Sequence, residues 1–319
     1  MTNHSSFPAS GVDPMTNVPT GGAMTQTTNH DIANAAEIER RAAELATCGS
    51  LEMGAHRPED AVRIAELLPT GTRVYVNHLP RHSLDVTLNS SIAVSRAGLE
   101  AVPHMAVRRI GSRAEAENFL KRAVKEAGVS KVLLLGGDLH APAGPYKDAA
   151  ALLGEGLLRD AGIREVALAA YPEGHPRIAN EILWSALSEK IGMARAQGLG
   201  PYVVSQFTFA PSRIIDMCGK LARLHPDIPV YVGLPGPTSP AKLIKFAQVC
   251  GVSASLRAMT AQGMGAVRLF TNTDPVDQLH AVAQHLDGGA TSNVVGVHMF
   301  TFGGIESAAR WINKQIATE

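Results

Sequence analysis

The stretches KVLLLGGDL at residues 131–139 and EVALAAYPEGHP at residues 165–176 decide the fold. In both, a run of apolar residues without polar alternation ends in a cluster of glycine, proline and charged residues. Continuous apolar runs are typical of strands buried on both faces, as in parallel sheets. The segments between such runs have helical periodicity, and this alternation predicts parallel strands joined by crossover helices.

Eight strand candidates of this kind follow one another along the chain. They are Ser50–Gly54, Arg73–Leu79, Ala101–Val107, Lys131–Gly137, Glu165–Tyr171, Tyr202–Phe209, Val230–Leu234 and Val294–Phe302. Helices are predicted near residues 58–68, 85–98, 113–127, 147–161, 178–197, 211–224, 240–250, 274–286 and 304–316. Eight such units predict an α/β fold of the (β/α)8 type, the TIM barrel. An open doubly wound sheet is the main competitor, but no GxGxxG follows the first strand.

The N-terminal region differs from the rest of the chain. Residues 1–32 are rich in Thr, Asn, Ser, Gly and Pro and have no apolar periodicity, which predicts a disordered tail. A helix is predicted over Ile32–Ala46, and residues 33–319 are predicted to form a single barrel with this N-terminal extension. The stretch SASLRAMTAQ at residues 253–262 is compatible with an additional helix.

Composition excludes several classes of function. Lys+Arg and Asp+Glu are both 29, so a zero formal charge argues against nucleic acid or an anionic membrane as partner. No apolar run is long enough to span a bilayer, and no signal peptide is evident, so we expect a cytoplasmic protein. The three cysteines have no zinc-like spacing, and no metal site, P-loop, HExxH helix or Ser-His-Asp set is predicted.

Two carboxylates are candidates for catalysis, because strand ends and the loops after them build the active site of a barrel. Glu52 lies in the apolar first strand, where desolvation would raise its pKa and make it a proton donor near neutral pH. Asp138 follows two glycines at the end of the fourth strand. The structural alternatives are a buried or rim ion pair for Glu52 and a turn cap for Asp138.

Polar and aromatic groups at other strand ends are candidates for binding. The loop after the fifth strand is rigid and polar, which favours ligand contact over packing. Gln206 can offer both a donor and an acceptor to a planar heterocycle, and Phe207 or Phe209 could stack on a ring. Asn77 and His78 lie in the predicted second strand and His104 in the third, and core or rim histidines are the alternative interpretation.

Taken together, these stretches resemble the methylenetetrahydrofolate reductase family. AAYPEGHP at 169–176 resembles the family's fifth-strand signature most strongly. The supporting stretches are SLE at 50–52, LEAVPH at 99–104, GDL at 137–139 and SQFTF at 205–209. The resemblance runs from about Gly49 to the C-terminus, with the motifs in matching order on successive strands.

The resemblance implies that NADH or NADPH reduces FAD, and that the reduced flavin passes a hydride to 5,10-methylenetetrahydrofolate to give 5-methyltetrahydrofolate. It implies that Glu52 is the general acid that opens the ring to an iminium ion, and that the charge of Asp138 stabilises this cation. Gln206, Phe207 and Asp138 would contact the folate. The implied cofactor-binding residues are Asn77, His104, Gly137, Tyr146, Ala170, Tyr171, His175 and Lys190. Tetrahydrofolate derivatives and NAD(P)H are the expected partners, and self-association into a homo-oligomer is an open expectation.

The sequence departs from the family pattern mainly on the flavin side. Gly136 stands where an arginine that contacts flavin is common, and Lys190 is the only basic residue in LSEK at 187–190. Pro240 stands where a stacking aromatic is expected, and Asn77-His78 replaces a Thr-Tyr pair. Direct hydride transfer without flavin therefore remains open. The competing interpretations are a same-fold folate enzyme that works in the oxidative direction, a non-catalytic folate-binding barrel and an unrelated barrel lyase.

Overall fold

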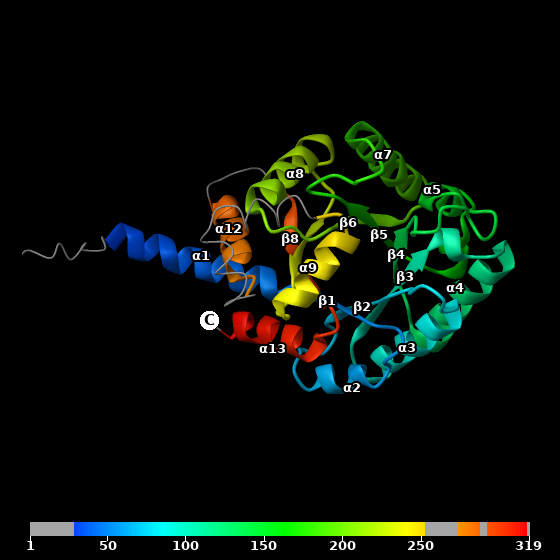
Figure 1. The fold of residues 1–319 in the computed structure, drawn as a ribbon, viewed down its shortest axis with the longest axis horizontal. Coiled ribbons are helices and arrows are strands. Elements are labelled where there is room, and N and C mark those ends of the chain that lie inside the picture. Colours follow the sequence, from blue (N-terminus) through cyan, green and yellow to red (C-terminus); the bar gives the residue numbers. More distant parts are fainter. Residues whose placement is uncertain (1–28, 253–273, 288–291, 318–319) are drawn as a thin grey trace, which may run out of the picture.

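Eight parallel strands close into a barrel, which confirms the predicted fold class (Figure 1). The computed structural model describes residues 29–252, 274–287 and 292–317. The strands are β1 (Ser50–Met53), β2 (Arg73–Val76), β3 (Glu100–Ala106), β4 (Lys131–Leu135), β5 (Glu165–Ala170), β6 (Gly200–Ser205), β7 (Val230–Pro235) and β8 (Val294–Phe300). They follow chain order around the barrel, and β8 pairs with β1 to close it, with Ser50 opposite His298.

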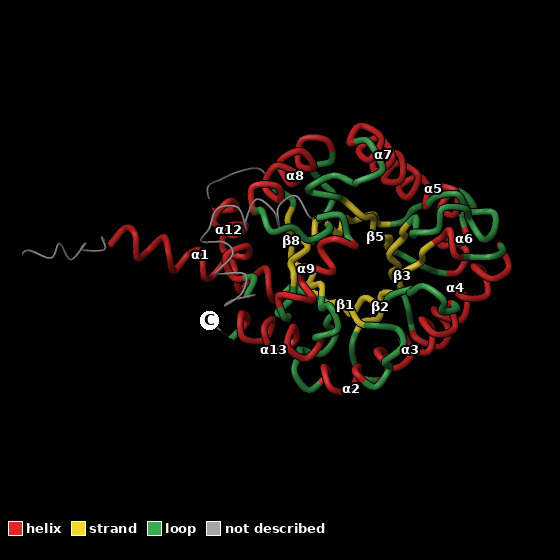
Figure 2. The backbone as a smooth tube through the Cα atoms, in the orientation of Figure 1, coloured by secondary structure: helices red, strands yellow, loops and turns green. Residues whose placement is uncertain are grey.

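Helices surround the strands, as Figure 2 shows. The helices of the described residues are α1 (Asn29–Thr47), α2 (Asp60–Ala65), α3 (Leu84–Arg96), α4 (Arg113–Ala127), α5 (Ala149–Leu153), α6 (Leu157–Ala161), α7 (Asn180–Ala196), α8 (Pro211–Leu224), α9 (Pro240–Val249), α12 (Val276–Asp287) and α13 (Ile305–Ile316), with a short 3-10 helix at Val107–Arg109. Helix α9 differs from the others because it lies over the barrel mouth, where its residues line a cavity together with residues of β1.

Two local predictions need correction. The single helix predicted over 147–161 is two short helices, α5 and α6, because the chain turns between them at Gly154 and at Gly156, which has a φ of 73°. The strand predicted over 202–209 ends at Ser205. Residues beyond it leave the sheet and form the loop at the mouth of the barrel.

Helix α4 shows how local sequence sets the boundaries of an element. The Ser112 side chain accepts a hydrogen bond from the backbone N–H of Glu115, while the Glu115 carboxylate accepts one from the N–H of Gly111. Gly128 ends the helix in the left-handed conformation, with a φ of 61°. These caps explain why the predicted bounds of 113–127 are confirmed.

The N-terminal helix α1 begins at Asn29 rather than at the predicted Ile32, and it packs against α12 and α13. Most of the predicted tail, residues 1–28, and the stretch SASLRAMTAQ lie outside the described residues. The three cysteines are free: Cys218 is buried, whereas Cys48 is exposed. Among the described residues, no helix is both long and apolar enough to cross a membrane.

In the described part of the chain, the buried apolar side chains form two layers in the barrel and a smaller cluster around Phe207 and Leu243 at its mouth. One fills the space between the strands and the surrounding helices and includes Leu134, Val166 and Leu168. The other lies inside the barrel, where Tyr75, Val102, Leu133, Ala167, Tyr202 and Val204 pack together. The hydroxyls of Tyr75 and Tyr202 are 3.0 Å apart, so these buried polar groups satisfy each other. The inner layer forms a solid floor beneath the C-terminal ends of the strands.

Close packing of β6 against β7 depends on Gly233. A Cβ atom at this position would lie 2.3 Å from the carbonyl oxygen of Ser205, so we expect Gly233→Ala to destabilise the protein by about 1–3 kcal/mol. Thermal unfolding followed by circular dichroism would measure the lower Tm. The matched control is Gly136→Ala, because a Cβ there meets nothing within 4 Å. An unchanged Tm for Gly233→Ala would contradict this account of the packing.

Candidate active site

Two cavities lie at the C-terminal ends of the strands, where a barrel carries its active site. The central cavity, of about 490 Å³, is lined by Glu52, His104, Gln206 and His298 and by residues of α9. The lateral cavity, of about 640 Å³, lies between the ends of β4 and β5 and helices α5 and α7. Ala169 and Tyr171 line both cavities, so a single wall separates them.

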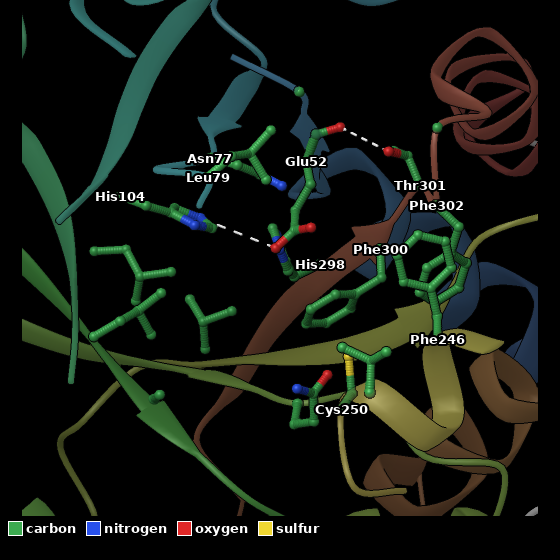
Figure 3. Close-up of a pocket in the computed structure, with 18 of the residues that line it drawn as sticks. Glu52, Asn77, Leu79, His104, Phe246, Cys250, His298, Phe300, Thr301 and Phe302 are labelled. Atoms are coloured by element: carbon green, nitrogen blue, oxygen red, sulfur yellow. Dashed lines mark hydrogen bonds and ion pairs between the residues drawn. The ribbon is translucent and has the colours of Figure 1, made fainter. Parts of the chain in front are cut away.

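Glu52 projects from β1 to the floor of the central cavity between two imidazoles (Figure 3). Its Oε1 lies 4.0 Å from Nε2 of His104 and 3.8 Å from Nε2 of His298. The Thr301 hydroxyl donates to the backbone carbonyl of Glu52 at 3.0 Å, which ties the end of β1 to the segment after β8. Only 18% of the Glu52 side chain is exposed, so its charge is largely shielded from water.

The expectation of a raised Glu52 pKa is wrong in direction. Burial is the largest influence and raises the pKa, but it is outweighed by the neighbouring His298 and His104 imidazoles and by the Asn77 side chain. The net pKa lies below the ordinary value of a glutamic acid. The sequence could predict the burial of this group but not the imidazoles that a distant strand brings to it.

The two histidines differ in their surroundings. Burial lowers the pKa of His104 to about 4, so its ring is neutral at pH 7. His298 is completely buried, and its Nδ1 lies 3.0 Å from the Ser50 hydroxyl. The same hydroxyl lies 3.3 Å from the carbonyl oxygen of Val297, to which it can also donate. A Ser50 hydroxyl that donates to Nδ1 leaves the ring proton on Nε2, facing Glu52, whereas one that donates to Val297 accepts the proton of Nδ1. Tyr75 packs edge-on against the His298 ring from below, with centroids 4.5 Å apart, and holds its orientation.

Aromatic side chains form the wall of the central cavity opposite Glu52. Phe246 of α9 stacks on Phe302 with ring centroids 4.9 Å apart, and Phe300 lies beside them (Figure 3). Phe302 has a φ of 50°, an uncommon backbone conformation for a bulky residue that is often found at functional sites. A stacking aromatic residue is expected at position 240, but the sequence has proline there. Phe246, on the helix that begins with Pro240, provides an aromatic ring instead.

Phe207 does not line the cavity as expected. It is completely buried, and its ring lies behind Phe300 and Phe302 at centroid distances of 5.2 and 5.1 Å. Gln206 does line the cavity, and its side-chain oxygen accepts a hydrogen bond from the N–H of Phe207 at 3.0 Å. This bond fixes the orientation of the Gln206 amide.

Asp138 lies apart from Glu52 and lines neither cavity. It forms an ion pair with Arg109, and 62% of its side chain is exposed. Tyr146, a predicted cofactor contact, is 1% exposed within the outer core and also lines neither cavity. The positions of these side chains depend on the folding of the loops after β3 and β4, which strand periodicity does not predict.

The other predicted site residues fall into two groups. The central cavity brings together Glu52, Asn77, His104, Ala170, Tyr171 and Gln206. The lateral cavity brings together Gly137, Tyr171, His175 and Lys190. Among the described residues, no cluster of three or more His, Cys, Asp or Glu side chains could hold a metal ion.

Sequence reasoning missed His298, Phe246, Phe300 and Arg108, which all line a cavity. A usable signal existed for two of them. His298 and Phe300 are two residues apart in β8, so they share the face of the strand that points into the barrel. The sequence held no such signal for the other two. Phe246 lies on helix α9, which covers the mouth of the barrel, and Arg108 lies in the short 3-10 helix after β3.

Comparisons with known proteins agree with this architecture. The family described as methylenetetrahydrofolate reductase matches residues 60–302. A similar solved structure is an uncharacterized protein from Clostridium thermocellum that binds two copies of 5-methyl-5,6,7,8-tetrahydrofolic acid, with a TM-score of 0.59, 12% identity, and coverage of 89% of this chain and 99% of that one. Another is dihydropteroate synthase from Thermus thermophilus, with a TM-score of 0.44, 16% identity, and coverage of 84% and 90%. At 12% identity, the likeness to the Clostridium thermocellum protein shows the fold alone.

Proposed function

The chain belongs to the methylenetetrahydrofolate reductase family, and on that premise we propose that it interconverts 5,10-methylenetetrahydrofolate and 5-methyltetrahydrofolate, with NAD(P)H as the source of hydride. In the reductive direction the bond between the methylene carbon and N10 breaks, the carbon receives a hydride and N10 receives a proton. The observation that carries the proposal is a shielded carboxylate between two imidazoles, on the floor of a cavity with an aromatic wall.

The central cavity suits a pterin ring. Phe246 and Phe302 offer flat apolar surfaces, and stacking on such rings is favourable for a planar heterocycle. The Gln206 amide can bond the polar edge of the pterin, because its orientation is already fixed by the N–H of Phe207. The binding of 5-methyltetrahydrofolate by the Clostridium thermocellum protein is consistent with this assignment.

Glu52 is the group that transfers the proton to N10. Because its pKa is lowered, Glu52 is ionised in the free enzyme at neutral pH, and the proton must reach it when the substrate is bound. His298 lies 3.8 Å away and Ser50 contacts the far side of its ring, so a small shift would connect the three groups in a chain. The ionised carboxylate also stabilises the cation that forms when the ring opens.

The lateral cavity fits a dinucleotide cofactor such as FAD. It contains Arg108, His175 and Lys190 for phosphate groups, and Gly136 and Gly137 allow close approach to the backbone. A flavin held there would accept hydride from NAD(P)H and return it to the folate. Tyr171, in the wall shared by both cavities, would position the cofactor next to the substrate.

We propose that the negative charge of Asp138 acts on the substrate cation from outside the central cavity, which its side chain does not line. We expect Asp138→Asn to slow the folate step by roughly 10-fold. This effect is smaller than the loss of a fully buried charge would cause, because water and Arg109 screen the Asp138 carboxylate. The folate half-reaction measured by stopped-flow absorbance tests this value. Arg109→Ala is the control, because it breaks the same ion pair but leaves the negative charge. Wild-type turnover in Asp138→Asn would remove Asp138 from the mechanism.

Two alternatives to the reductive assignment have specific consequences. The same site would catalyse the oxidative direction in a demethylation or one-carbon pathway, because one transition state serves both directions. A non-catalytic folate-binding barrel would need the aromatic wall but no proton chain. The Ser50–His298–Glu52 arrangement therefore favours an enzyme.

Absorbance spectroscopy of the purified protein tests the proposal. We expect a flavin spectrum that bleaches anaerobically with NAD(P)H and returns when methylenetetrahydrofolate is added. A colourless protein that oxidises NAD(P)H only in the presence of the folate would establish direct hydride transfer instead. A protein that binds 5-methyltetrahydrofolate but catalyses neither direction would refute the enzyme assignment.

A further inference from the structure

Tyr171 lies where three cavities meet. It lines the central and the lateral cavity, and it also lines a third cavity, of about 10 Å³, on the side of helix α7. Helix α7 packs against β5, the strand that ends just before Tyr171 (Figure 1). The other residues that line this small cavity are Ala169, Ala170, Leu183, Trp184 and Leu187. A folate in the central cavity and a cofactor in the lateral cavity would therefore be separated by the Tyr171 side chain.

Hydride transfer requires direct contact between the two ligands. Reacting atoms must approach to about 3–3.5 Å, which leaves no room for a side chain between them. The wall between the cavities must therefore open when both are occupied. Of the two residues that line both cavities, Ala169 carries only a methyl group, so Tyr171 is the larger obstacle.

The backbone around Tyr171 is fixed on both sides. The carbonyl of Ala170 accepts a hydrogen bond from the N–H of Gln206 at 2.8 Å, which ties the end of β5 to the end of β6. The carbonyl of Tyr171 accepts one from the N–H of Gly174 at 3.0 Å, and Pro172 restricts the backbone between these two residues. A movement of the backbone would break these bonds, whereas rotation of the Tyr171 side chain would break neither.

The side chain of Tyr171 is held less firmly than its backbone. Burial raises the pKa of its hydroxyl, and this hydroxyl has no hydrogen-bond partner in the part of the chain that the structure describes. Most buried hydroxyls have such a partner, which fixes their orientation. The ring contacts the His175 ring edge-on, with centroids 5.6 Å apart, and on the side of α7 the small cavity leaves it without packing atoms.

The small cavity provides space for a limited movement. A volume of about 10 Å³ accommodates at most about one water molecule, so the Tyr171 ring can tilt toward α7 but cannot leave the wall completely. Trp184 is held beside this cavity by Lys220, whose ammonium nitrogen lies 4.2 Å from the centroid of the Trp184 ring. A tilt of Tyr171 into the small cavity therefore changes the surroundings of Trp184 and of Leu187.

We propose that Tyr171 is a gate between the two cavities: its ring separates them in the free protein and tilts into the small cavity when a folate fills the central cavity. The cofactor then meets the folate, and it stays separated from the central cavity while no folate is bound. The proposal rests on the proposed function for the two ligands, and it adds a residue that controls when hydride transfer can occur.

Fluorine NMR of the full-length chain labelled with 5-fluorotryptophan tests the movement without turnover. The chain has two tryptophans, so Trp311→Phe assigns the Trp184 signal. We expect saturating 5-methyltetrahydrofolate to shift this signal in the wild-type protein and to leave it in place in Tyr171→Ala, which has no ring to tilt. Calorimetry on the same samples measures folate binding. Binding with an unmoved Trp184 signal, or with an equal shift in Tyr171→Ala, would overturn the gate alone. Absence of folate binding would overturn the proposed function as well.

Filling the small cavity tests the gate in the reaction. Leu187 lines this cavity but neither of the larger ones, and Leu187→Phe places a larger side chain there. We expect this variant to bind NAD(P)H and the folate with wild-type affinity but to slow the folate half-reaction about 10-fold or more. Leu187→Met nearly conserves the volume of the side chain and is the matched control, with an unchanged rate.

A double variant separates the gate from a structural effect of Leu187→Phe. Adding Tyr171→Ala should recover most of the lost rate, because no ring then has to tilt into the filled cavity. A wild-type rate in Leu187→Phe would overturn the proposal. A rate that falls together with ligand affinity, or that does not recover in the double variant, would show that Leu187→Phe only disturbs the packing of α7 and would also overturn it.

Discussion

Glu52→Gln is expected to lower the rate of methylenetetrahydrofolate reduction by roughly 10²–10⁴-fold, the usual contribution of a general acid. Glutamine keeps the shape and hydrogen-bonding capacity of the side chain, but it can neither transfer the proton to N10 nor stabilise the cation. Reduction of the bound cofactor by NAD(P)H should be nearly unchanged, because that step does not involve N10. Anaerobic stopped-flow measurement of the two half-reactions separates these effects.

The matched control is Glu100→Gln, which makes the same chemical change at the start of β3. Glu100 pairs with Lys131 at 2.6 Å and does not line either cavity, so both half-reactions should keep wild-type rates. If the protein works without flavin, the two quantities to compare in each variant are the affinity for NAD(P)H and the rate of folate turnover. Equal loss of both half-reactions in Glu52→Gln would defeat the assignment of Glu52 as the acid.

His298→Leu should have the second large effect, because it removes the partner that opposes the desolvation of Glu52. Burial raises the Glu52 pKa and the nearby His298 imidazole lowers it, so the pKa should rise in the variant. A higher pKa extends the protonated form of Glu52 to higher pH. We therefore expect the limb of the pH–rate profile that reports this carboxyl group to move to higher pH. The maximal rate should fall by roughly 10²-fold because the proton chain is interrupted.

The pH dependence of the folate half-reaction checks this expectation. His104→Leu is the informative comparison, since it removes an imidazole at a similar distance from the same oxygen. The pKa of His104 is about 4, so this ring is neutral across most of the working range and its loss should move the profile less. A profile that stays in place in His298→Leu would show that His298 does not control the protonation of Glu52.

The architecture was predictable from the sequence because it depends on patterns that repeat eight times. Runs such as KVLLL at 131–135 and EVALAA at 165–170 can be buried only between two layers of other residues, and the helical segments between them allow only parallel connections. The same logic placed Glu52 within an apolar strand. It also placed Tyr171 and Gln206 in the C-terminal parts of the fifth and sixth predicted strands; in the structure both lie just beyond the strand ends and line the central cavity.

The tertiary structure alone decided which groups face one another. Glu52 and His298 are far apart in the sequence, and closure of the barrel brings Oε1 of Glu52 within 3.8 Å of Nε2 of His298. Because the sequence indicated burial of Glu52 but not this partner, it predicted the wrong direction for the Glu52 pKa. The pairing of Asp138 with Arg109 depends on two loops, and the position of Phe246 depends on a helix that lies over the barrel mouth. The sequence by itself determined the barrel, because periodicity is local and repeated. The electrostatics of the site came only with the fold, because charges and rings act through distances in space that no local pattern encodes.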